Sequence, residues 1–230
     1  MPARHPWLII VAAPKEVRAA LDGLGTGAAI ETPQLWGAAE SPGVVLVRSG
    51  VGKSASAGAT ARWYDPARHA GVLSIGIAGA LPGSGLSIGD VVLADPSLPG
   101  DDGVRTPQGF MGLDRIGFGE DAAPIAPDPV SRAALIGLVD RAGPVATVST
   151  GSGTDALAAE IAARTGAIAE AMEGYSCALS ARRIHPRARF AEIRVVSNTT
   201  GDREHQRWDL GAALARLGSV LGPVVGALSG

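Results

Sequence analysis

Two glutamates stand where an expected strand gives way to an expected helix. Glu16 follows the apolar run at residues 7–12, and Glu173 stands beside Met172 at the start of a helical pattern. The carboxyl ends of parallel strands meet at one edge of an α/β sheet, and ligands bind at that edge. Carboxylates there can move protons in acid–base chemistry. A glutamate in a first helical turn also commonly compensates the helix dipole, so the surroundings must decide.

Residues 50–54, Gly-Val-Gly-Lys-Ser, end like a phosphate-binding loop. That loop needs a glycine five positions before Gly52, but Val47 stands there within an expected strand. The spacing therefore argues against an ATP-binding loop. A glycine-rich turn between strand and helix still presents backbone N–H groups to a ligand at the sheet edge.

Residues 151–156, Gly-Ser-Gly-Thr-Asp-Ala, match the dinucleotide-binding pattern G-x-G-x-x-A, with Glu170 or Glu173 about 20 residues further on. Only about 75 residues follow this turn, too few for the remainder of a dinucleotide-binding fold. An NAD-dependent enzyme is therefore a weaker alternative that rests on this turn alone.

The histidines, the cysteine and the net charge argue against several other classes of protein. The four histidines have no metal-ligand spacing, and Cys177 is the single cysteine, so we expect no metal and no cofactor. The formal net charge is −2, which argues against binding to nucleic acid. One cysteine fits a reducing compartment, and we expect a cytoplasmic protein.

Short apolar segments alternate with helical patterns along the chain. Six predicted strands are nearly all apolar, as strands covered on both faces are. The alternation predicts an α/β fold, with a single domain over residues 1–230 and a central, mixed, twisted β-sheet flanked by helices. The predicted strands are residues 7–12, 44–49, 72–77, 91–94, 145–149 and 191–196, and the predicted helices are residues 14–24, 53–64, 130–141, 155–164 and 172–183.

Two segments fall outside this alternation. Residues 210–228 carry one apolar stripe, which predicts a helix packed on the sheet and not a membrane anchor. Residues 96–129 are irregular and rich in Gly, Pro and Asp. Long irregular loops often bind ligands, so Phe110 is a candidate substrate contact; a surface excursion with tucked-in aromatic rings is the alternative.

Taken in order, the motifs resemble the purine nucleoside phosphorylase and methylthioadenosine/adenosylhomocysteine nucleosidase superfamily along nearly the whole chain. The segments that carry the resemblance are IIVAAPKEV, RSGVGKSASAGAT, LSIGIAGALPGSGLSIGDVVLAD, AMEG and VVSNTTGD. The resemblance implies a nucleoside phosphorylase-like fold, a small-molecule nucleoside substrate, no cofactor and a homodimer or higher homo-oligomer. It implies catalytic roles for Glu16, Glu173 and Asn198, and substrate contacts by Val51, Ala78, Gly79, Met172, Ser197 and Asp202.

A narrower similarity, carried by residues 101–119 and 197–210, is to the futalosine hydrolases, nucleosidases of menaquinone biosynthesis. The methylthioadenosine nucleosidases have Asp at the position of Asn198. Hypoxanthine presents two acceptors, O6 and N7, on the edge where adenine presents a donor and an acceptor. An amide can donate twice, so Asn198 favours a 6-oxopurine.

The resemblance implies hydrolysis of the glycosidic bond of futalosine, with release of hypoxanthine. Glu16 is expected to activate water, with its pKa raised by burial and lowered by Lys15. Glu173 would bind the ribose hydroxyls. Asn198 cannot supply a proton to the departing purine, so water or Asp202 would have to supply it.

A phosphorylase would need cations for phosphate. Arg48 and Arg194 are the candidates, although arginines within strands usually lie at an edge or on the surface. The alternatives that stay open are a methylthioadenosine/adenosylhomocysteine nucleosidase, a purine nucleoside phosphorylase and a non-enzymatic nucleoside-binding protein. The sequence leaves open which side chain stacks on the purine (Phe110, Phe118 or Trp208) and which arginine (Arg105, Arg115 or Arg203) binds the distal carboxylate of futalosine.

Overall fold

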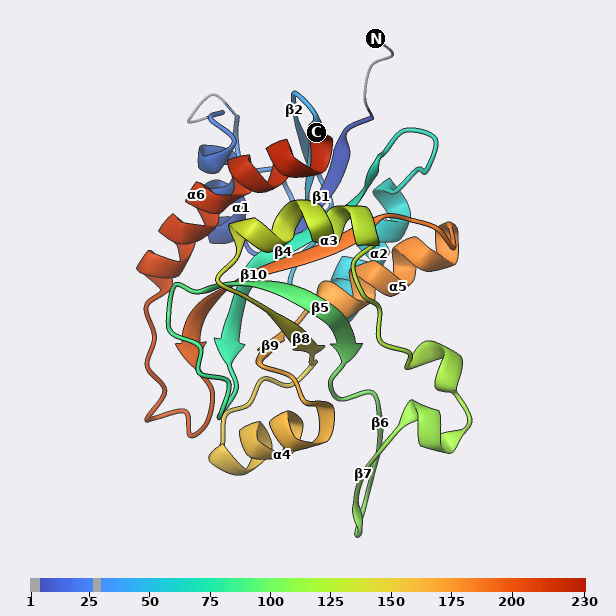
Figure 1. Ribbon diagram of the computed structural model, residues 1–230, viewed down its shortest axis with the longest axis vertical. Coiled ribbons are helices and arrows are strands. Elements are labelled where there is room, and N and C mark those ends of the chain that lie inside the picture. The colour runs from blue at the N-terminus through green and yellow to red at the C-terminus, as the bar shows by residue number, and fades with distance from the viewer. Residues whose placement is uncertain (1–4, 27–29) are drawn as a thin grey trace.

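The computed structural model describes residues 5–26 and 30–230. Its main sheet contains eight strands, ordered β10-β5-β8-β9-β4-β1-β3-β2, with a further pairing of β10 with β4 (Figure 1). The bounds of these strands are β1 Trp7–Val11, β2 Ala38–Ser41, β3 Val44–Arg48, β4 Gly71–Ala80, β5 Val91–Pro99, β8 Arg141–Thr147, β9 Ala169–Ala171 and β10 Phe190–Thr199.

The pairing of β10 with β4 closes five of the strands into a ring, from which β1, β3 and β2 extend. Small apolar side chains from all five strands of this ring form one buried cluster, which includes Ala78, Ala94, Val145, Ala171 and Val196. β1, β3, β4 and β10 run parallel to one another. The carboxyl ends of these four strands therefore meet at one edge of the sheet.

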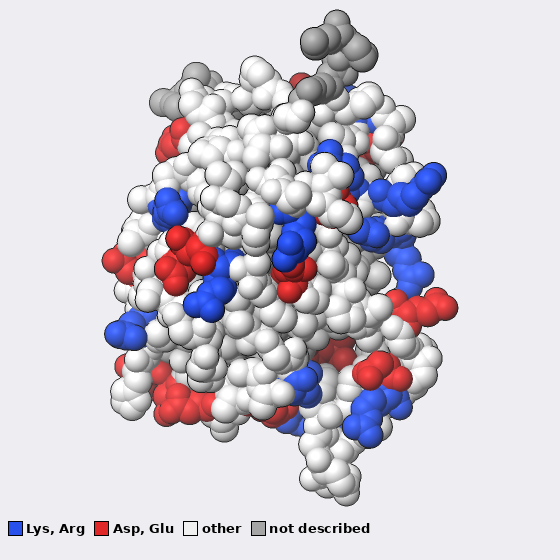
Figure 2. Space-filling model, viewed as in Figure 1, with Lys and Arg blue, Asp and Glu red and all other residues white. Residues whose placement is uncertain are grey.

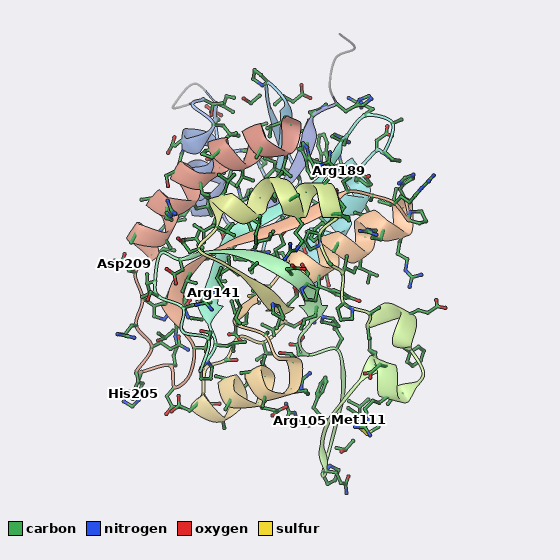
Figure 3. The ribbon with its side chains drawn as sticks, viewed as in Figure 1. Arg105, Met111, Arg141, Arg189, His205 and Asp209 are labelled. Carbon is green, nitrogen blue, oxygen red and sulfur yellow. The ribbon has the colours of Figure 1, made fainter. Side chains whose placement is uncertain are left out.

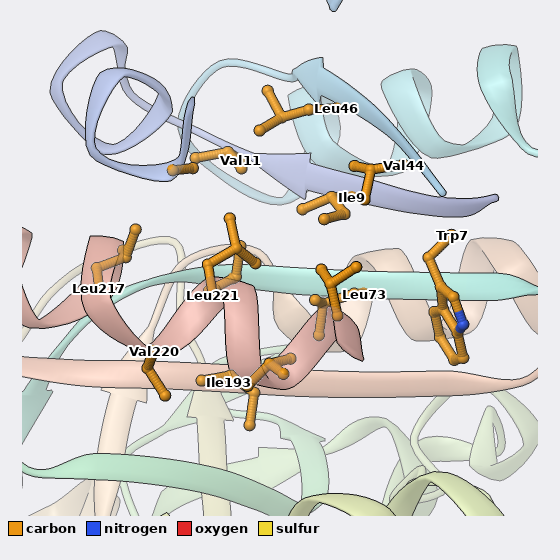
Figure 4. Packing of buried hydrophobic residues seen from close by; sticks show 14 of the residues in the cluster. Trp7, Ile9, Val11, Val44, Leu46, Leu73, Ile193, Leu217, Val220 and Leu221 are labelled. Atoms are coloured by element: carbon orange, nitrogen blue, oxygen red, sulfur yellow. The ribbon is translucent and has the colours of Figure 1, made fainter. Parts of the chain in front are cut away.

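Alternation along β1 explains why helices cover both faces of this part of the sheet. Trp7, Ile9 and Val11 pack with α1 (Pro14–Gly23) and α6 (Leu210–Ser229). Leu8 and Ile10 point to the opposite face and pack with α2 (Lys53–Trp63) and α5 (Gly174–Ile184). Figure 4 shows the first of these clusters, with Leu217 and Leu221 of α6 facing the strands.

The helix α6 is the one described helix that is long and apolar enough to cross a membrane, by length and composition only. It packs against α1, β4 and β10, and its apolar stripe is buried in the first cluster. The Trp7 indole N–H donates to the Leu228 carbonyl at 3.2 Å and fixes the end of the helix on β1. The prediction of a sheet-packing helix here is confirmed.

Two further helices complete the fold. α3 (Pro129–Leu135) lies on the α6 side, and Leu135 joins the cluster there. α4 (Asp155–Thr165) covers one end of the sheet, where Ala158 and Ile161 are buried. Thr154 caps α4 by accepting a hydrogen bond from the Leu157 amide at 3.2 Å.

The six predicted strands and six predicted helices are all present, with shifted ends. The irregular segment at residues 96–129 is more ordered than predicted. It contains the end of β5 and a hairpin of β6 (Gly103–Thr106) and β7 (Gly109–Gly112), followed by two short 3-10 helices, Leu113–Ile116 and Gly119–Asp121. The hairpin projects away from the main sheet (Figure 1).

Candidate active site

A cavity of about 780 Å³ lies at the edge where the parallel strands end. This volume suits a small organic ligand. The lining comes from the turn after β1, the ends of β4 and β10, the segment after β9, and the start of α6. The lining residues that carry the argument are Glu16, Gly79, Glu170, Met172, Glu173 and Asn198.

Glu16 is buried at the start of α1, with 5% of its surface exposed. One carboxylate oxygen accepts a hydrogen bond from the Ala13 amide at 2.8 Å, and the other accepts one from the Ile77 amide at 2.9 Å. Burial raises the pKa of Glu16, and the negative charge of Glu173 raises it further, while these two hydrogen bonds and Arg194 lower it. The cation that lowers the pKa of Glu16 is thus Arg194. Our prediction that Lys15 has this effect was wrong. A carboxylate of raised pKa facing a cavity can serve as a general base.

Glu173 precedes the first turn of α5 and is also buried. Its Oε1 accepts a hydrogen bond from the Gly52 amide at 3.1 Å, and its Oε2 accepts one from Arg194 Nη1 at 3.1 Å. The turn that resembles a phosphate-binding loop therefore orients a carboxylate. Both oxygens are held, which fixes the side chain toward the cavity.

Arg194 lies within β10 with 1% of its side chain exposed. Besides Glu173, it donates from Nε to Glu192 at 2.8 Å and from Nη2 to the Ser74 hydroxyl at 2.9 Å. Its two carboxylate partners raise its pKa above the usual range, although burial opposes them. The expectation of an edge or surface position was wrong, because β10 lies between β4 and β5.

Two glycines make room for this cluster. A Cβ on Gly76 would lie 2.6 Å from Glu16 Oε1 and 2.7 Å from Arg194 Nη1. A Cβ on Gly174 would lie 1.9 Å from the carboxylate of Glu192. The charged side chains therefore occupy space that any other residue at these two positions would fill.

Asn198 lies near the end of β10, next to Gly79 of β4. Its Oδ1 accepts a hydrogen bond from the Ser197 hydroxyl at 2.9 Å, and its Nδ2 donates to the Thr199 carbonyl at 2.9 Å. One of its two N–H donors remains for a ligand. A Cβ on Gly79 would lie 3.2 Å from Asn198 Nδ2, so the glycine keeps the space beside the amide open.

Glu170 is a cavity residue to which our sequence analysis gave no site role. It accepts hydrogen bonds from the Ser152 amide at 2.7 Å and the Ser152 hydroxyl at 2.6 Å, and burial raises its pKa. It pairs with Gly79 across the sheet. The turn that resembles a dinucleotide-binding motif is thus fixed by a carboxylate from β9. The short strand β9 was not predicted, and the sequence connected Glu170 with this turn only through the dinucleotide-binding pattern.

The structure gathers most of the predicted site residues in one cavity. Phe110 and Asp202 lie outside its lining. Phe110 belongs to the projecting hairpin and packs under the Arg164 guanidinium, 4.0 Å from the ring centre, and Figure 3 shows the neighbouring Arg105 and Met111 far from the sheet edge. Asp202 accepts a hydrogen bond from the Asp155 amide at 2.9 Å. The predicted residues that do line the cavity are Glu16, Val51, Ala78, Gly79, Met172, Glu173, Ser197 and Asn198.

The structure narrows two questions that the sequence left open. Among the three aromatic candidates, Trp208 alone lines the cavity. Among the three arginine candidates, Arg203 alone does so, and its guanidinium lies 4.9 Å from the Trp208 ring centre. The Gln206 Oε1 accepts hydrogen bonds from both, each at 2.9 Å, and holds the pair in place.

Other charged groups have structural partners. Lys53 forms ion pairs with Asp101 and Asp102. Arg48 lies outside the cavity lining and donates to the Pro33 carbonyl at 3.4 Å. Within residues 5–26 and 30–230, no group of three His, Cys, Asp or Glu side chains could hold a metal ion.

Acidic and basic side chains are interspersed on the face of the molecule that Figure 2 shows.

Comparison with known proteins gives consistent matches. Residues 8–226 match the Phosphorylase superfamily. The chain is 42% identical to a futalosine hydrolase of Acidothermus cellulolyticus over 64% of this chain and 60% of that protein, so it spans about three fifths of that relative. It is 37% identical to a futalosine hydrolase of Streptomyces coelicolor over 77% of this chain and 76% of that protein.

The fold also matches a solved structure. The 5′-methylthioadenosine/S-adenosylhomocysteine nucleosidase of Colwellia psychrerythraea, in complex with adenine, superposes with a TM-score of 0.76 at 22% identity, over 99% of this chain and 97% of that chain. The chain therefore belongs to the phosphorylase superfamily, as its α/β fold and sheet-edge cavity indicate. Within that superfamily it belongs to the futalosine hydrolase family, and both family predictions are confirmed.

The close packing around Gly174 can be tested by Gly174→Ala. The added methyl group would overlap the Glu192 carboxylate and disturb the buried ion pairs, so we expect the free energy of unfolding to fall by about 3 kcal/mol. Gly226→Ala is the matched control, because a Cβ there contacts nothing within 4 Å. Urea denaturation measures both variants, and equal stability of the two would contradict the packing described here.

Proposed function

We propose that this chain hydrolyses the N-glycosidic bond of futalosine and releases hypoxanthine and dehypoxanthinyl futalosine, a step of menaquinone biosynthesis. The observation that carries the proposal is a buried carboxylate, Glu16, that faces the same cavity as the amide of Asn198. The futalosine hydrolases of A. cellulolyticus and S. coelicolor support the choice of substrate.

Glu16 acts as the general base in this proposal. As the bond between C1′ and N9 lengthens, the ribosyl group gains positive charge and the purine gains negative charge. A water molecule attacks C1′ and gives its proton to Glu16. The bond electrons leave with the purine, which takes a proton from solvent water, because Asp202 lies outside the cavity lining.

The other two side chains stabilise the two ends of the separating charge. Glu173 accepts hydrogen bonds from the ribose hydroxyls, and its negative charge lies near the developing cation. Asn198 donates its remaining N–H to an acceptor of the 6-oxopurine, where the negative charge accumulates. Met172 and Val51 pack on the sugar, and Ala78 and Gly79 bound it through their backbone.

The surroundings of Glu16 favour water over phosphate as the nucleophile. A phosphate dianion would be repelled by Glu16 and Glu173. Arg194, which pairs with Glu173, already binds two carboxylates and a serine hydroxyl. Arg48 lies outside the cavity lining. These contacts support hydrolysis and argue against the phosphorylase alternative.

Arg203 and Trp208 are suited to the carboxyphenyl end of futalosine. Arg203 is a cation on the cavity wall, and it forms no ion pair among residues 5–26 and 30–230. A guanidinium can bind a carboxylate through two parallel hydrogen bonds, and an indole beside it can contact an aromatic ring. Arg203 is therefore the proposed partner of the distal carboxylate.

The cellular setting proposed here is the cytoplasm, and the proposed assembly is a homodimer or a higher homo-oligomer. Val51 lines the cavity while 58% of its surface is exposed, so a second copy of the chain has apolar surface to cover at the cavity mouth. Sedimentation equilibrium gives the stoichiometry.

Glu16→Gln tests the base. The variant should bind substrate with nearly unchanged affinity, while kcat falls at least about a hundredfold, because glutamine cannot accept the proton. In the unaltered enzyme, kcat/KM should fall as the pH drops through the raised pKa of Glu16, which lies above its ordinary value of 4.5. Steady-state rates and isothermal titration calorimetry give both quantities. Retention of more than about a tenth of kcat would remove Glu16 from this role.

Asn198→Asp tests whether Asn198 makes the enzyme prefer a 6-oxopurine. An ionised aspartate cannot donate to O6, so kcat/KM for futalosine should fall about a hundredfold relative to that for its 6-amino counterpart. The matched control is Ser197→Ala, which removes the hydroxyl that orients the amide and should lower both rates alike. An unchanged preference in Asn198→Asp would contradict the role given to Asn198.

A further inference from the structure

Glu192 is a fully buried carboxylate that the proposed reaction does not use. It lies on β10 with 0% of its side chain exposed. Its Oε1 accepts a hydrogen bond from Arg194 Nε at 2.8 Å, and its Oε2 accepts one from the Ser97 hydroxyl on β5. An unpaired carboxylate at this depth would be costly, so the ion pair with Arg194 is what allows Glu192 to be there.

The position of Glu192 ties it to the catalytic side chains. Its carboxylate packs against Gly174, the first residue of α5, where a Cβ would lie within 2.0 Å of all three carboxylate atoms. Glu173 immediately precedes that residue. Glu192 therefore lies directly beneath the turn that presents Glu173 to the cavity, although it does not line the cavity itself.

Arg194 connects Glu192 to both catalytic carboxylates. Its Nε is held by Glu192, its Nη2 by Ser74 and its Nη1 by Glu173. The same Nη1 lies 2.7 Å, and Glu16 Oε1 lies 2.6 Å, from the position that a Cβ on Gly76 would take. The guanidinium is therefore near Glu16, although its ion pairs among the described residues are with Glu173 and Glu192. The ion pair with Glu192 thus fixes the position of the guanidinium. It also reduces the net positive charge that acts on Glu16.

We propose that Glu192 is a positioning residue for glycosidic cleavage, which fixes Arg194 against Glu173 and offsets the positive charge that Arg194 presents to Glu16. The inference rests on the proposed role of Glu16 as the base. A guanidinium without this counter-ion would stabilise the ionised form of Glu16 more strongly and make it a weaker base. Glu192 keeps the proton affinity of Glu16 high enough for it to take a proton from water.

The charges around Glu16 determine the sign of the expected effect. Glu173 faces it from the segment after β9 and Arg194 faces it from β10, and Lys15 is its chain neighbour at the cavity. Glu192 is bound to the far side of Arg194, through Nε. Cys177 on α5, also near Arg194, is neutral because burial raises its pKa to about 11. Neutralising Glu192 removes a negative charge from this group, so the pKa of Glu16 should fall.

Glu192→Gln tests the proposal, because glutamine keeps the shape and removes the charge. The low-pH limb of the kcat/KM profile should move down by about one pH unit, and kcat near neutral pH should fall about threefold, as for a weaker base. Ser97→Ala is the matched control, since it removes a hydrogen bond to Glu192 and leaves the charge. Its low-pH limb should not move. A loss of rate in Glu192→Gln with an unmoved limb would overturn the proposal.

Glu192→Asp provides a second test that does not depend on the folding of the glutamine variant. It retains the charge but withdraws the carboxylate from Arg194, so kcat should fall while the low-pH limb moves less than in Glu192→Gln. An unchanged kcat would overturn the positioning role.

A substrate-free measurement separates this inference from the proposed function. A ¹³C NMR titration of the glutamate carboxyls, with the Glu16 signal assigned by its loss in Glu16→Gln, should give a lower Glu16 pKa in Glu192→Gln than in the unaltered enzyme. The rate measurements use any nucleoside that the enzyme cleaves. Failure to cleave futalosine would thus overturn the proposed substrate alone, whereas an unchanged Glu16 pKa would overturn the inference about Glu192.

Discussion

Arg194 is a buried guanidinium that binds carboxylates from two elements, Glu192 on its own strand and Glu173 before α5, and it lies beside a third, Glu16. Removing one partner from such a group leaves a buried charge uncompensated, at a cost of about 3–5 kcal/mol. The cluster explains why Gly174 and Gly76 have no side chain, because a Cβ at either position would overlap one of the charged groups. It also requires β10 to be interior, which the pairing of β10 with both β4 and β5 provides.

The sheet converts this charge cluster into a site. Parallel β1, β4 and β10 end together, so the cavity receives Gly79 from β4, Asn198 from β10 and Glu16 from the helix that follows β1. In the proposed reaction, the acidic side chains contact the sugar and the amide contacts the departing base. The proposed reaction develops positive charge on the sugar and negative charge on the purine, so the fixed charges match those of the transition state.

The sequence predicted site residues correctly where they stand next to the end of a clearly apolar strand. Glu16 and Asn198 stand at the ends of apolar strands, so strand prediction alone brings them to one edge. Glu192 and Arg194 stand inside a strand, where the alternation of residues does not indicate which side chains they will contact. Their burial depends on the pairing of β10 with β4, which closes the ring. The short β9 and the exposed hairpin that carries Phe110 lack an apolar pattern, so Glu170 was given no site role and Phe110 was assigned to the site. In the structure, the two turns that resemble nucleotide-binding motifs donate backbone hydrogen bonds to Glu173 and Glu170.

The central claim is that this chain hydrolyses a 6-oxopurine nucleoside with a carboxylate-activated water. The most direct measurement is chromatographic detection of free base after incubation of the purified protein with futalosine, inosine or methylthioadenosine, each with and without phosphate. The account predicts hypoxanthine from futalosine at a rate independent of phosphate. Release from inosine only when phosphate is present, or adenine from methylthioadenosine in preference to hypoxanthine from futalosine, would contradict it.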